Sequence, residues 1–323
     1  MTSKSSRSRD ESFALLKGLF NIAVTPFDAA GALDPAALSE NLERMLGFGY
    51  DGFLIGGTYG EFPTMTLNER AALFRTAAET VAGRAPLLLC SAAADLPTAE
   101  ALTELAGELG GIPMVTPPFV SEVTDDQIVA FFRLLAKVSR SGLVIYNAPG
   151  VGITLSPGLI ERLAEIPEIV GVKQGDLSPG VVDALLGRVG GRLRLFCASD
   201  LQMAGPVSLG FDGLSSTNAG ALPELVLEAF RNFAGGAVGK AAAAQARWFG
   251  YREFARRAGQ PQTVKAAMAL RGWRGGRVRP PLRDLDEAQG AELAAIMDSL
   301  VTLPQDDVPA SGAPLPAEAA ITD

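Results

Sequence analysis

Short apolar segments alternate with longer amphipathic stretches along most of the chain. Eight of the apolar segments have the character of strands, and they recur at intervals of roughly 20–35 residues, the spacing of βα units. These segments are Leu19–Val24, Phe53–Ile55, Leu87–Cys90, Met114–Thr116, Leu143–Tyr146, Val170–Lys173, Leu193–Cys197 and Gly213–Ser215. Their apolar residues are continuous rather than alternating, which predicts a parallel sheet covered on both faces and therefore an α/β fold.

The predicted helices begin with sequences that are typical of helix N-termini. Asp34 precedes Pro35, as an N-cap precedes a proline in the first turn, and Thr66 with Glu69 has the pattern of a capping box. Thr124 stands before a stretch in which apolar residues recur at helical spacing. Eight such alternating units predict a TIM (β/α)8 barrel.

Composition divides the chain into four parts. We expect the barrel over residues 13–235 and a C-terminal helical extension over residues 236–303, where the pattern is helical and holds no strand candidate. Residues 1–12 are polar and lack the apolar segment of a secretory signal, so we expect a disordered leader. Residues 304–323 are rich in Pro, Ala and Asp, which predicts a flexible acidic tail. An open doubly wound sheet is the alternative fold, but no Gly-x-Gly-x-x-Gly turn follows the first strand.

Charge and residue content exclude several classes of function. The formal net charge is −8 and the arginines are scattered, so neither nucleic acid nor an anionic membrane is an expected partner. No apolar run approaches the roughly 18 residues of a transmembrane helix. The 323 residues include no histidine, which excludes catalytic triads and dyads built on it. Cys90 and Cys197 provide neither a disulfide framework nor a usual zinc site, so we expect a cytoplasmic protein without a metal.

Without histidine, nucleophilic and acid–base chemistry must come from Lys, Tyr, Asp or Glu side chains. Lysine is scarce and occurs as Lys4, Lys17, Lys137, Lys173, Lys240 and Lys265. Lys173 differs from the others because it ends an apolar strand segment. Desolvation disfavours its ammonium form, and the same penalty favours the neutral, nucleophilic amine of a Schiff-base lysine. The structural alternative is a lysine that reaches water or forms an ion pair.

Two further strand ends carry candidate chemistry, since barrel active sites lie at the carboxyl ends of strands. After the second strand, Gly56–Glu61 reads Gly-Gly-Thr-Tyr-Gly-Glu, whose glycines allow close backbone approach and whose hydroxyls and N–H groups can hold a carboxylate. Tyr146 ends the fifth strand, where a phenol can relay protons. The alternatives are a turn of purely steric origin and a tyrosine that serves packing.

Together, these three elements suit the chemistry of a 2-oxo acid. The lysine can form an imine with the ketone, the phenol can shuttle protons, and the Gly-Thr loop can hold the carboxylate. At these residues the chain resembles the dihydrodipicolinate synthase / N-acetylneuraminate lyase family of pyruvate-dependent class I aldolases, from about residue 20 to about residue 234. The matching motifs are Gly57-Thr58-Tyr59-Gly60-Glu61 for Gly-Thr/Ser-Thr-Gly-Glu, Tyr146-Asn147-x-Pro149 for Tyr-Asn-x-Pro, and Gly171-Val172-Lys173 for Gly-hydrophobic-Lys.

The resemblance implies a role for each matching residue. Lys173 corresponds to the imine-forming lysine, and Tyr146 to the tyrosine that relays protons. Thr58 corresponds to the threonine that contacts both that tyrosine and the pyruvate carboxylate, in a substrate-binding loop with Gly57 and Tyr59. The resemblance also implies a main-chain contact near the imine from Ser215, no cofactor beyond the covalent imine, and a homotetramer.

Two departures from the family pattern concern the substrate. Dihydrodipicolinate synthases usually continue Tyr-Asn-x-Pro with Ser-Arg-Thr-Gly, in which the Arg grips the second substrate's carboxylate, whereas Gly150–Ile153 reads Gly-Val-Gly-Ile here. Those enzymes also lend the neighbouring subunit a tyrosine from Thr-Pro-Tyr-Tyr, whereas Thr116–Phe119 reads Thr-Pro-Pro-Phe. Tyr59, in place of a threonine, either supplies the missing hydroxyl or narrows the pocket. Valine cannot pair with a carboxylate and phenylalanine cannot transfer protons, so both changes disfavour lysine biosynthesis.

The sequence predicts a class I lyase in which Lys173 forms an imine with pyruvate or another 2-oxo acid. The expected reaction is aldol cleavage, condensation or dehydration of a 2-oxo-3-deoxy sugar acid or a similar hydroxy-2-oxo acid, with an aldehyde as the second small molecule. One alternative is 4-hydroxy-tetrahydrodipicolinate synthase, which joins pyruvate to aspartate semialdehyde, and another is a 2-oxo-acid-binding barrel without catalysis. Roles for Glu61, Asp176 and Asp200 stay open, although Glu61 most simply braces its loop and Asp200 most simply caps a helix.

Overall fold

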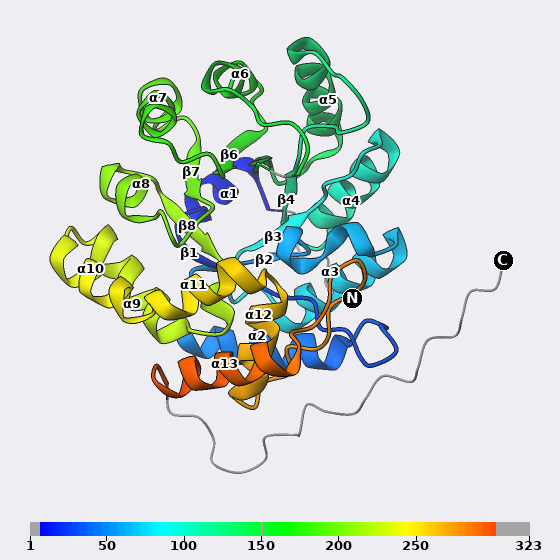
Figure 1. Ribbon diagram of the computed structural model, residues 1–323. Helices are drawn as coiled ribbons and strands as arrows, with labels where there is room; N and C mark the ends of the chain where they lie inside the picture. The colour runs from blue at the N-terminus through cyan, green and yellow to red at the C-terminus, as the bar shows by residue number, and fades with distance from the viewer. Residues whose placement is uncertain (1–6, 150, 302–323) are drawn as a thin grey trace.

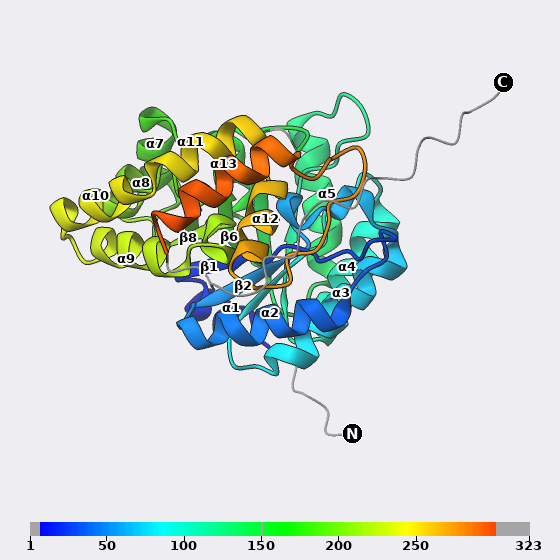
Figure 2. The same cartoon turned by 60° about the horizontal axis from the view of Figure 1, so that its bottom comes forward.

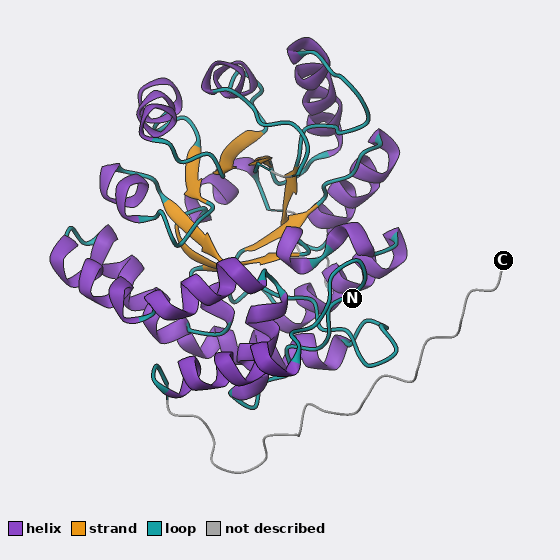
Figure 3. Ribbon diagram, viewed as in Figure 1, coloured by secondary structure: helices purple, strands orange, loops and turns teal. Residues whose placement is uncertain are grey.

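The computed structural model describes residues 7–149 and 151–301. Within these residues, parallel strands pair in chain order, and β8 pairs with β1 to close a barrel. The strands are β1 (Gly18–Ile22), β2 (Gly52–Ile55), β3 (Leu87–Cys90), β4 (Ile112–Val115), β5 (Leu143–Asn147), β6 (Ile169–Gln174), β7 (Arg194–Cys197) and β8 (Gly213–Ser216). Figure 1 looks along the barrel axis, and Figure 3 shows the ring of strands inside the ring of helices. The predicted TIM barrel is confirmed.

One helix, α1 (Arg9–Leu15), precedes the first strand, and the helices that follow the strands cover the outside of the barrel (Figure 1). The latter are α2 (Pro35–Phe48), α3 (Leu67–Val81), α4 (Leu96–Glu108), α5 (Asp125–Val138), α6 (Pro157–Leu163), α7 (Pro179–Val189), α8 (Ala204–Leu209) and α9 (Pro223–Ala234). Short 3-10 turns, η1 (Thr58–Gly60), η2 (Phe62–Thr64) and η3 (Asn218–Gly220), shape the loops after β2 and β8. The predicted caps are confirmed, because Asp34, Thr66 and Thr124 each accept a hydrogen bond from the backbone of the helix that follows.

The strands lie where the apolar pattern predicts them, with small differences at their ends. β1 stops at Ile22 rather than Val24, because its pairing with β2 ends there. β6 continues to Gln174, so Lys173 lies within the strand rather than at its last position. Its neighbours in the sheet are Tyr146 on β5 and Phe196 on β7.

Large and small residues alternate inside the barrel. The rings of Phe20 and Phe196 meet edge to face, with centroids 4.9 Å apart. A Cβ atom at Gly52 would lie 2.4 Å from the Phe20 ring, and one at Gly213 would lie 2.6 Å from the Phe196 ring. The two glycines therefore make room for the two phenylalanines, which fill the interior as in other small barrels.

The N-terminal segment corrects one expectation. Residues 9–12, expected to belong to a disordered leader, lie in α1, which Ser8 and Glu11 begin with a capping box. Residues 1–6 of that leader lie outside the described residues. The helix packs on the amino end of the barrel, where Arg9 donates to the carbonyl of Pro167 and Arg194 donates to the carbonyl of Phe13. These contacts are with residues far away in the chain, which local composition does not show.

Four helices follow the barrel, and the tail expected over residues 304–323 lies outside the described residues. The helices are α10 (Val238–Arg247), α11 (Phe249–Ala258), α12 (Gln262–Leu270) and α13 (Glu287–Asp298). Figure 2 shows them together on one side of the molecule, with α11 and α13 at the end of the barrel opposite α1. No helix in the described part of the chain combines the length and apolar character that a membrane crossing requires.

Candidate active site

Lys173 is buried in the barrel, and its side chain contacts the ring of Tyr146. The residue is 4% exposed, and among the described residues no carboxylate forms an ion pair with it. Desolvation lowers the pKa of Lys173 from 10.5 to about 8. About a tenth of such amines are neutral at pH 7, compared with less than about one in a thousand at the ordinary pKa. Lys173 is therefore neither a surface lysine nor, within the described residues, an ion-paired one.

Tyr146 lies directly across from Lys173, because β5 and β6 pair these two residues. The Lys173 Nζ atom is 4.4 Å from the centroid of the tyrosine ring. The ring is 4% exposed, and burial raises the pKa of the Tyr146 phenol, which stays protonated at neutral pH. A protonated phenol beside an amine can give a proton to a departing hydroxyl and take it back later.

Thr58 completes the cluster from the loop after β2. Its hydroxyl shares a hydrogen bond with the hydroxyl of Tyr146, and either oxygen can be the donor. Two preceding glycines shape this turn: Gly56 has a φ of 65°, and a Cβ atom at Gly57 would lie 2.7 Å from the side chain of Leu54. The three residues Lys173, Tyr146 and Thr58 are thus brought together at the carboxyl ends of three strands, as the sequence predicts for a barrel site.

Glu61 ends the same loop and fastens it to the C-terminal extension. It adopts a left-handed conformation with a φ of 59°, which is unusual for a residue with a side chain. Its buried carboxylate accepts hydrogen bonds from Lys265 Nζ at 2.5 Å and from the backbone N–H of Arg279 at 2.9 Å. Burial lowers the pKa of Lys265, which Glu61 partly offsets. Glu61 therefore braces the loop, as expected.

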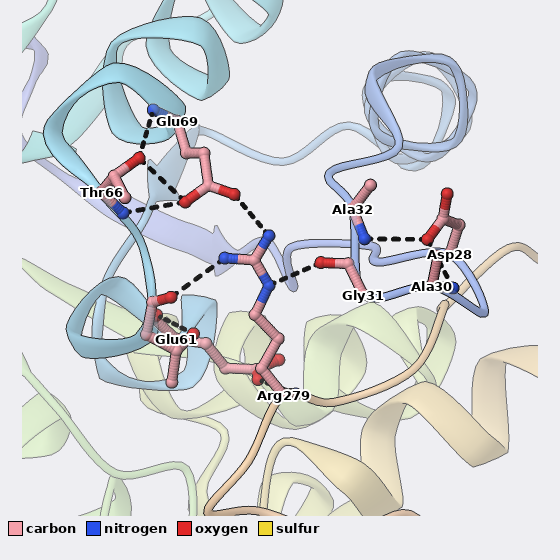
Figure 4. Close-up of polar contacts among 9 residues, drawn as sticks. Asp28, Ala30, Gly31, Ala32, Glu61, Thr66, Glu69 and Arg279 are labelled. Atoms are coloured by element: carbon pink, nitrogen blue, oxygen red, sulfur yellow. Dashed lines mark hydrogen bonds and ion pairs between the residues drawn. The ribbon is translucent and has the colours of Figure 1, made fainter.

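The side chain of Arg279 extends this connection, as Figure 4 shows. It donates hydrogen bonds to the carbonyls of Gly31 at 2.8 Å and Thr64 at 3.0 Å, and to the carboxylate of Glu69 at 2.5 Å. The guanidinium lowers the pKa of Glu69 to about 2. One arginine of the extension thus joins the loops after β1 and β2, which the sequence pattern does not reveal.

A cavity of about 360 Å³ lies next to the loop that carries Thr58, although none of Lys173, Tyr146 and Thr58 lines it. Tyr59, next to Thr58 in the chain, and Ser215 of β8 are part of its wall, and the rest includes side chains of α11. The Ser215 hydroxyl donates to the carbonyl of Cys197 at 3.4 Å. Tyr59 is 39% exposed, and in the described part of the chain no hydrogen bond joins its hydroxyl to that of Tyr146.

Asp200 corrects the expectation of a helix cap. Helix α8 begins four residues later, after Met203. The buried Asp200 carboxylate instead accepts hydrogen bonds from the Ser216 hydroxyl and from Asn218 Nδ2 at 3.0 Å, and desolvation raises its pKa. It ties the end of β7 to the end of β8. Asp176, whose role stayed open, accepts from the backbone N–H of Ser178 at 3.1 Å.

Two buried thiols near the cluster are neutral. Burial raises the pKa of Cys197 to about 12 and also raises that of Cys90. Neither thiol is a thiolate at neutral pH. Within residues 7–149 and 151–301, no group of three or more His, Cys, Asp or Glu side chains could hold a metal ion.

The two departures noted in the sequence lie together. Phe119 and Val151 are in the wall of a second cavity of about 430 Å³, which none of Lys173, Tyr146 and Thr58 lines. A Cβ atom at Gly152 would lie 2.8 Å from the Phe119 side chain, so the two loops are in close contact. Arg70 also lines this second cavity, and its Nη2 donates to the carbonyl of Cys90 at 2.6 Å.

Comparison with known proteins identifies the relatives of this chain. A model of the dihydrodipicolinate synthetase family matches residues 15–300. 4-Hydroxy-tetrahydrodipicolinate synthase 1 of Streptomyces coelicolor is 35% identical over 282 residues, which cover 86% of this chain and 92% of that protein. The 4-hydroxy-tetrahydrodipicolinate synthase of Thermosynechococcus vestitus is 30% identical over 281 residues, 86% of this chain and 95% of the relative.

Solved structures agree on the fold. A putative dihydrodipicolinate synthetase from Pseudomonas aeruginosa superposes with a TM-score of 0.84 at 24% identity, over 88% of this chain and 99% of its own. A prophage protein of the dihydrodipicolinic acid synthase family from E. coli, solved with pyruvate, gives 0.81 at 24% identity, over 88% and 98%. At such identities the structures support the barrel fold alone. On the family match over most of its length and on its relatives, the chain belongs to the dihydrodipicolinate synthetase family, whose members are lyases.

Proposed function

We propose that this lyase works through an imine between Lys173 and pyruvate or another 2-oxo acid. A buried lysine supports the proposal, because no carboxylate pairs with it within residues 7–149 and 151–301. Its Nζ lies 4.4 Å from the centroid of a tyrosine ring, and the hydroxyl of that tyrosine is hydrogen-bonded to a threonine. No cofactor is needed, because the protonated imine itself withdraws electrons from the adjacent carbon. Gly57, Thr58 and Tyr59 supply the loop that holds the carboxylate of the 2-oxo acid.

The steps follow from the positions of the groups. The neutral Lys173 amine attacks the ketone carbon to give a carbinolamine, and Tyr146 donates a proton to the hydroxyl that leaves as water. In the cleavage direction the bond between C3 and C4 of a 4-hydroxy-2-oxo acid breaks, the 4-hydroxyl proton passes to Tyr146, and an aldehyde leaves. The electron pair remains on the enamine, which takes a proton at C3, and water then releases pyruvate. Thr58 holds the Tyr146 hydroxyl in place throughout.

The substrate we propose is a hydroxy-2-oxo acid such as a 2-oxo-3-deoxy sugar acid. The second candidate is condensation of pyruvate with aspartate semialdehyde, which the names of the relatives favour. Val151 and Phe119 count against it, because this chain has neither the arginine nor the tyrosine that the synthases usually have at those motifs. On the resemblance alone, we also propose a homotetramer, which light scattering in solution would measure.

Imine and enamine formation can be tested with pyruvate alone, before the aldehyde is identified. The measurement is the exchange of the methyl protons of pyruvate for deuterium. The enamine forms only by loss of a C3 proton, so the wild-type enzyme should exchange pyruvate protons in deuterium oxide, followed by proton NMR. The Lys173→Met variant should show only the background rate. Wild-type exchange no faster than background would exclude the proposed mechanism. Product analysis with 2-oxo-3-deoxy sugar acids, and with pyruvate plus aspartate semialdehyde, then distinguishes the two substrate candidates.

A further inference from the structure

The cavity beside the candidate site is closed on one side by the helical extension. It extends from Tyr59 and Ser215 to α11, which Figure 2 shows at the end of the barrel opposite α1. Its volume of about 360 Å³ lies in the lower part of the range of small-molecule sites. Lys173 does not line this cavity, but Tyr59, next to Thr58 in the chain, and Ser215 do, so a substrate that extends from Lys173 past these two residues would reach α11.

Arg252 of α11 lines this cavity and is held in a fixed position. Its guanidinium lies 5.1 Å from the centroid of the Trp248 ring and 5.4 Å from that of Phe249. Arg252 Nη2 donates to the carbonyl of Gln245 at 3.3 Å, and Gln245 Nε2 donates in turn to the carbonyl of Asp200 at 3.0 Å. The arginine is thus tied through Gln245 to the end of β7, which limits its movement relative to the barrel.

The same guanidinium lacks a carboxylate partner. Within the described ranges no ion pair includes Arg252, and its buried Nε has no hydrogen-bond partner. Asp200 also lines the cavity, but its carboxylate oxygens are engaged by Ser216 and Asn218. Thr217 Oγ1 in the cavity wall is likewise buried and unpartnered. A buried N–H or hydroxyl group without a hydrogen-bond partner destabilises the protein unless a ligand or a water molecule forms the missing hydrogen bond.

We propose that Arg252 binds a second carboxylate at the far end of the substrate, and that the enzyme acts on 2-oxo acids that carry a carboxylate at each end. The inference rests on the proposed imine at Lys173, which fixes one end of the substrate. A guanidinium presents a planar set of N–H donors that matches a carboxylate, and the low dielectric of a cavity strengthens the pairing. Arg252 would thus provide from α11 a cation that the loop after β5 lacks in this chain.

Trapping of matched 2-oxo acids at Lys173 tests this assignment. The diacids 2-oxoglutarate, 2-oxoadipate and 2-oxopimelate are compared with 2-oxopentanoate, 2-oxohexanoate and 2-oxoheptanoate, which have the same lengths but end in a methyl group. Each is reduced onto the protein with borohydride, and the half-saturating concentration is read by mass spectrometry. We expect at least one diacid to reach half-saturation at a concentration at least about tenfold lower than its matched monoacid, the size of a single charge-assisted interaction.

Two arginine variants locate the effect. Arg252→Gln should remove the preference for diacids. For each variant, the half-saturating concentration of every 2-oxo acid is divided by that of pyruvate with the same variant. Arg257→Gln is the control, since Arg257 lies on the same helix but pairs with Glu292 at 2.6 Å; its preference should equal that of the wild type. The inference would be overturned if the wild type preferred no diacid over its matched monoacid. It would also be overturned if the preference remained in Arg252→Gln. Absence of a pyruvate adduct would instead overturn the proposed function.

Discussion

Two buried lysines in this molecule have different surroundings and different consequences. Lys265 is 2% exposed, but Glu61 and the carbonyl of Arg277 accept its hydrogen bonds at 2.5 and 2.6 Å. Lys173 is buried to a similar extent and has no such acceptor among the described carboxylates. Desolvation lowers the pKa of both. The paired amine is held as a charged brace, whereas the unpaired amine is available for reaction.

The pH dependence of imine formation follows from the pKa of Lys173. With a pKa of about 8, the neutral fraction rises about tenfold between pH 7 and pH 9 and then levels off. We therefore expect the initial rate of imine formation with pyruvate, measured by rapid quenching with borohydride, to rise about tenfold over this range and to plateau above it. A rate that keeps rising tenfold per pH unit beyond pH 9 would show that the pKa of Lys173 is not lowered by its surroundings.

Tyr146 should matter for proton transfer more than for binding. We expect Tyr146→Phe to slow deuterium exchange into pyruvate by about 10²–10⁴-fold, the usual contribution of a positioned acid–base group. Half-saturation for pyruvate should change by much less. Tyr251→Phe is the matched control, because the buried Tyr251 hydroxyl has no hydrogen-bond partner among the described residues, and this variant should exchange pyruvate at close to the wild-type rate. Equal losses in the two variants would mean that Tyr146 has no special part in the relay.

At the scale of elements, the helical extension and the loop after β2 form one unit. Glu61, Lys265 and Arg279 connect them through buried charged contacts, and Arg279 also reaches the loop after β1 (Figure 4). The loop that carries Thr58 is thus fixed by residues more than two hundred positions later in the chain. The extension therefore helps to position the candidate site as well as to cover it.

Removal of one charge of the buried Glu61–Lys265 ion pair should destabilise the fold strongly. Glu61→Gln leaves a buried ammonium without its counter-charge, and we expect a loss of about 3–5 kcal/mol in the free energy of unfolding, measured in urea. The double variant Glu61→Gln with Lys265→Met, which removes both charges, should recover much of that loss. For comparison, Arg257→Gln breaks an exposed pair and should cost less than about 1 kcal/mol. A single-variant loss as small as this control would show that the buried pair contributes little.

Elements with local signals were predictable from the sequence, and those that depend on distant contacts were not. The strands and the caps at Asp34, Thr66 and Thr124 follow from patterns within a few residues. Lys173 could be singled out because a charged residue in an apolar strand conflicts with its surroundings. The partner of Lys265 lies 204 positions away, and the side chain of Asp200 turns toward β8 rather than toward α8. No local pattern encodes either contact.

At the scale of the whole molecule, the buried Lys173 should lower the free energy of unfolding, because the burial that makes its amine reactive also disfavours its charged form. Its pKa of about 8 in the folded chain lies below the value near 10.5 in the unfolded chain, so protonation disfavours folding, fully so below about pH 8. Lys173→Met removes this penalty, and we expect the variant to be more stable at pH 7 by up to about 3 kcal/mol. The difference should narrow as the pH rises from 8 to 10.5. Urea unfolding at pH 7 and pH 9.5 measures it, and a variant less stable than the wild type at pH 7 would contradict the account.

We expect Lys173, which is buried and has no carboxylate partner among the described residues, to form the imine. The most direct test is reduction of the full-length protein with borohydride in the presence of pyruvate, followed by intact-mass measurement and peptide mapping. We expect one pyruvate-sized adduct, located on Lys173, with Lys265 unmodified because Glu61 holds it as an ion pair. Loss of the adduct in Lys173→Met would confirm the assignment. A wild-type protein that carries no adduct with pyruvate or with longer 2-oxo acids, or one modified at another lysine, would contradict it.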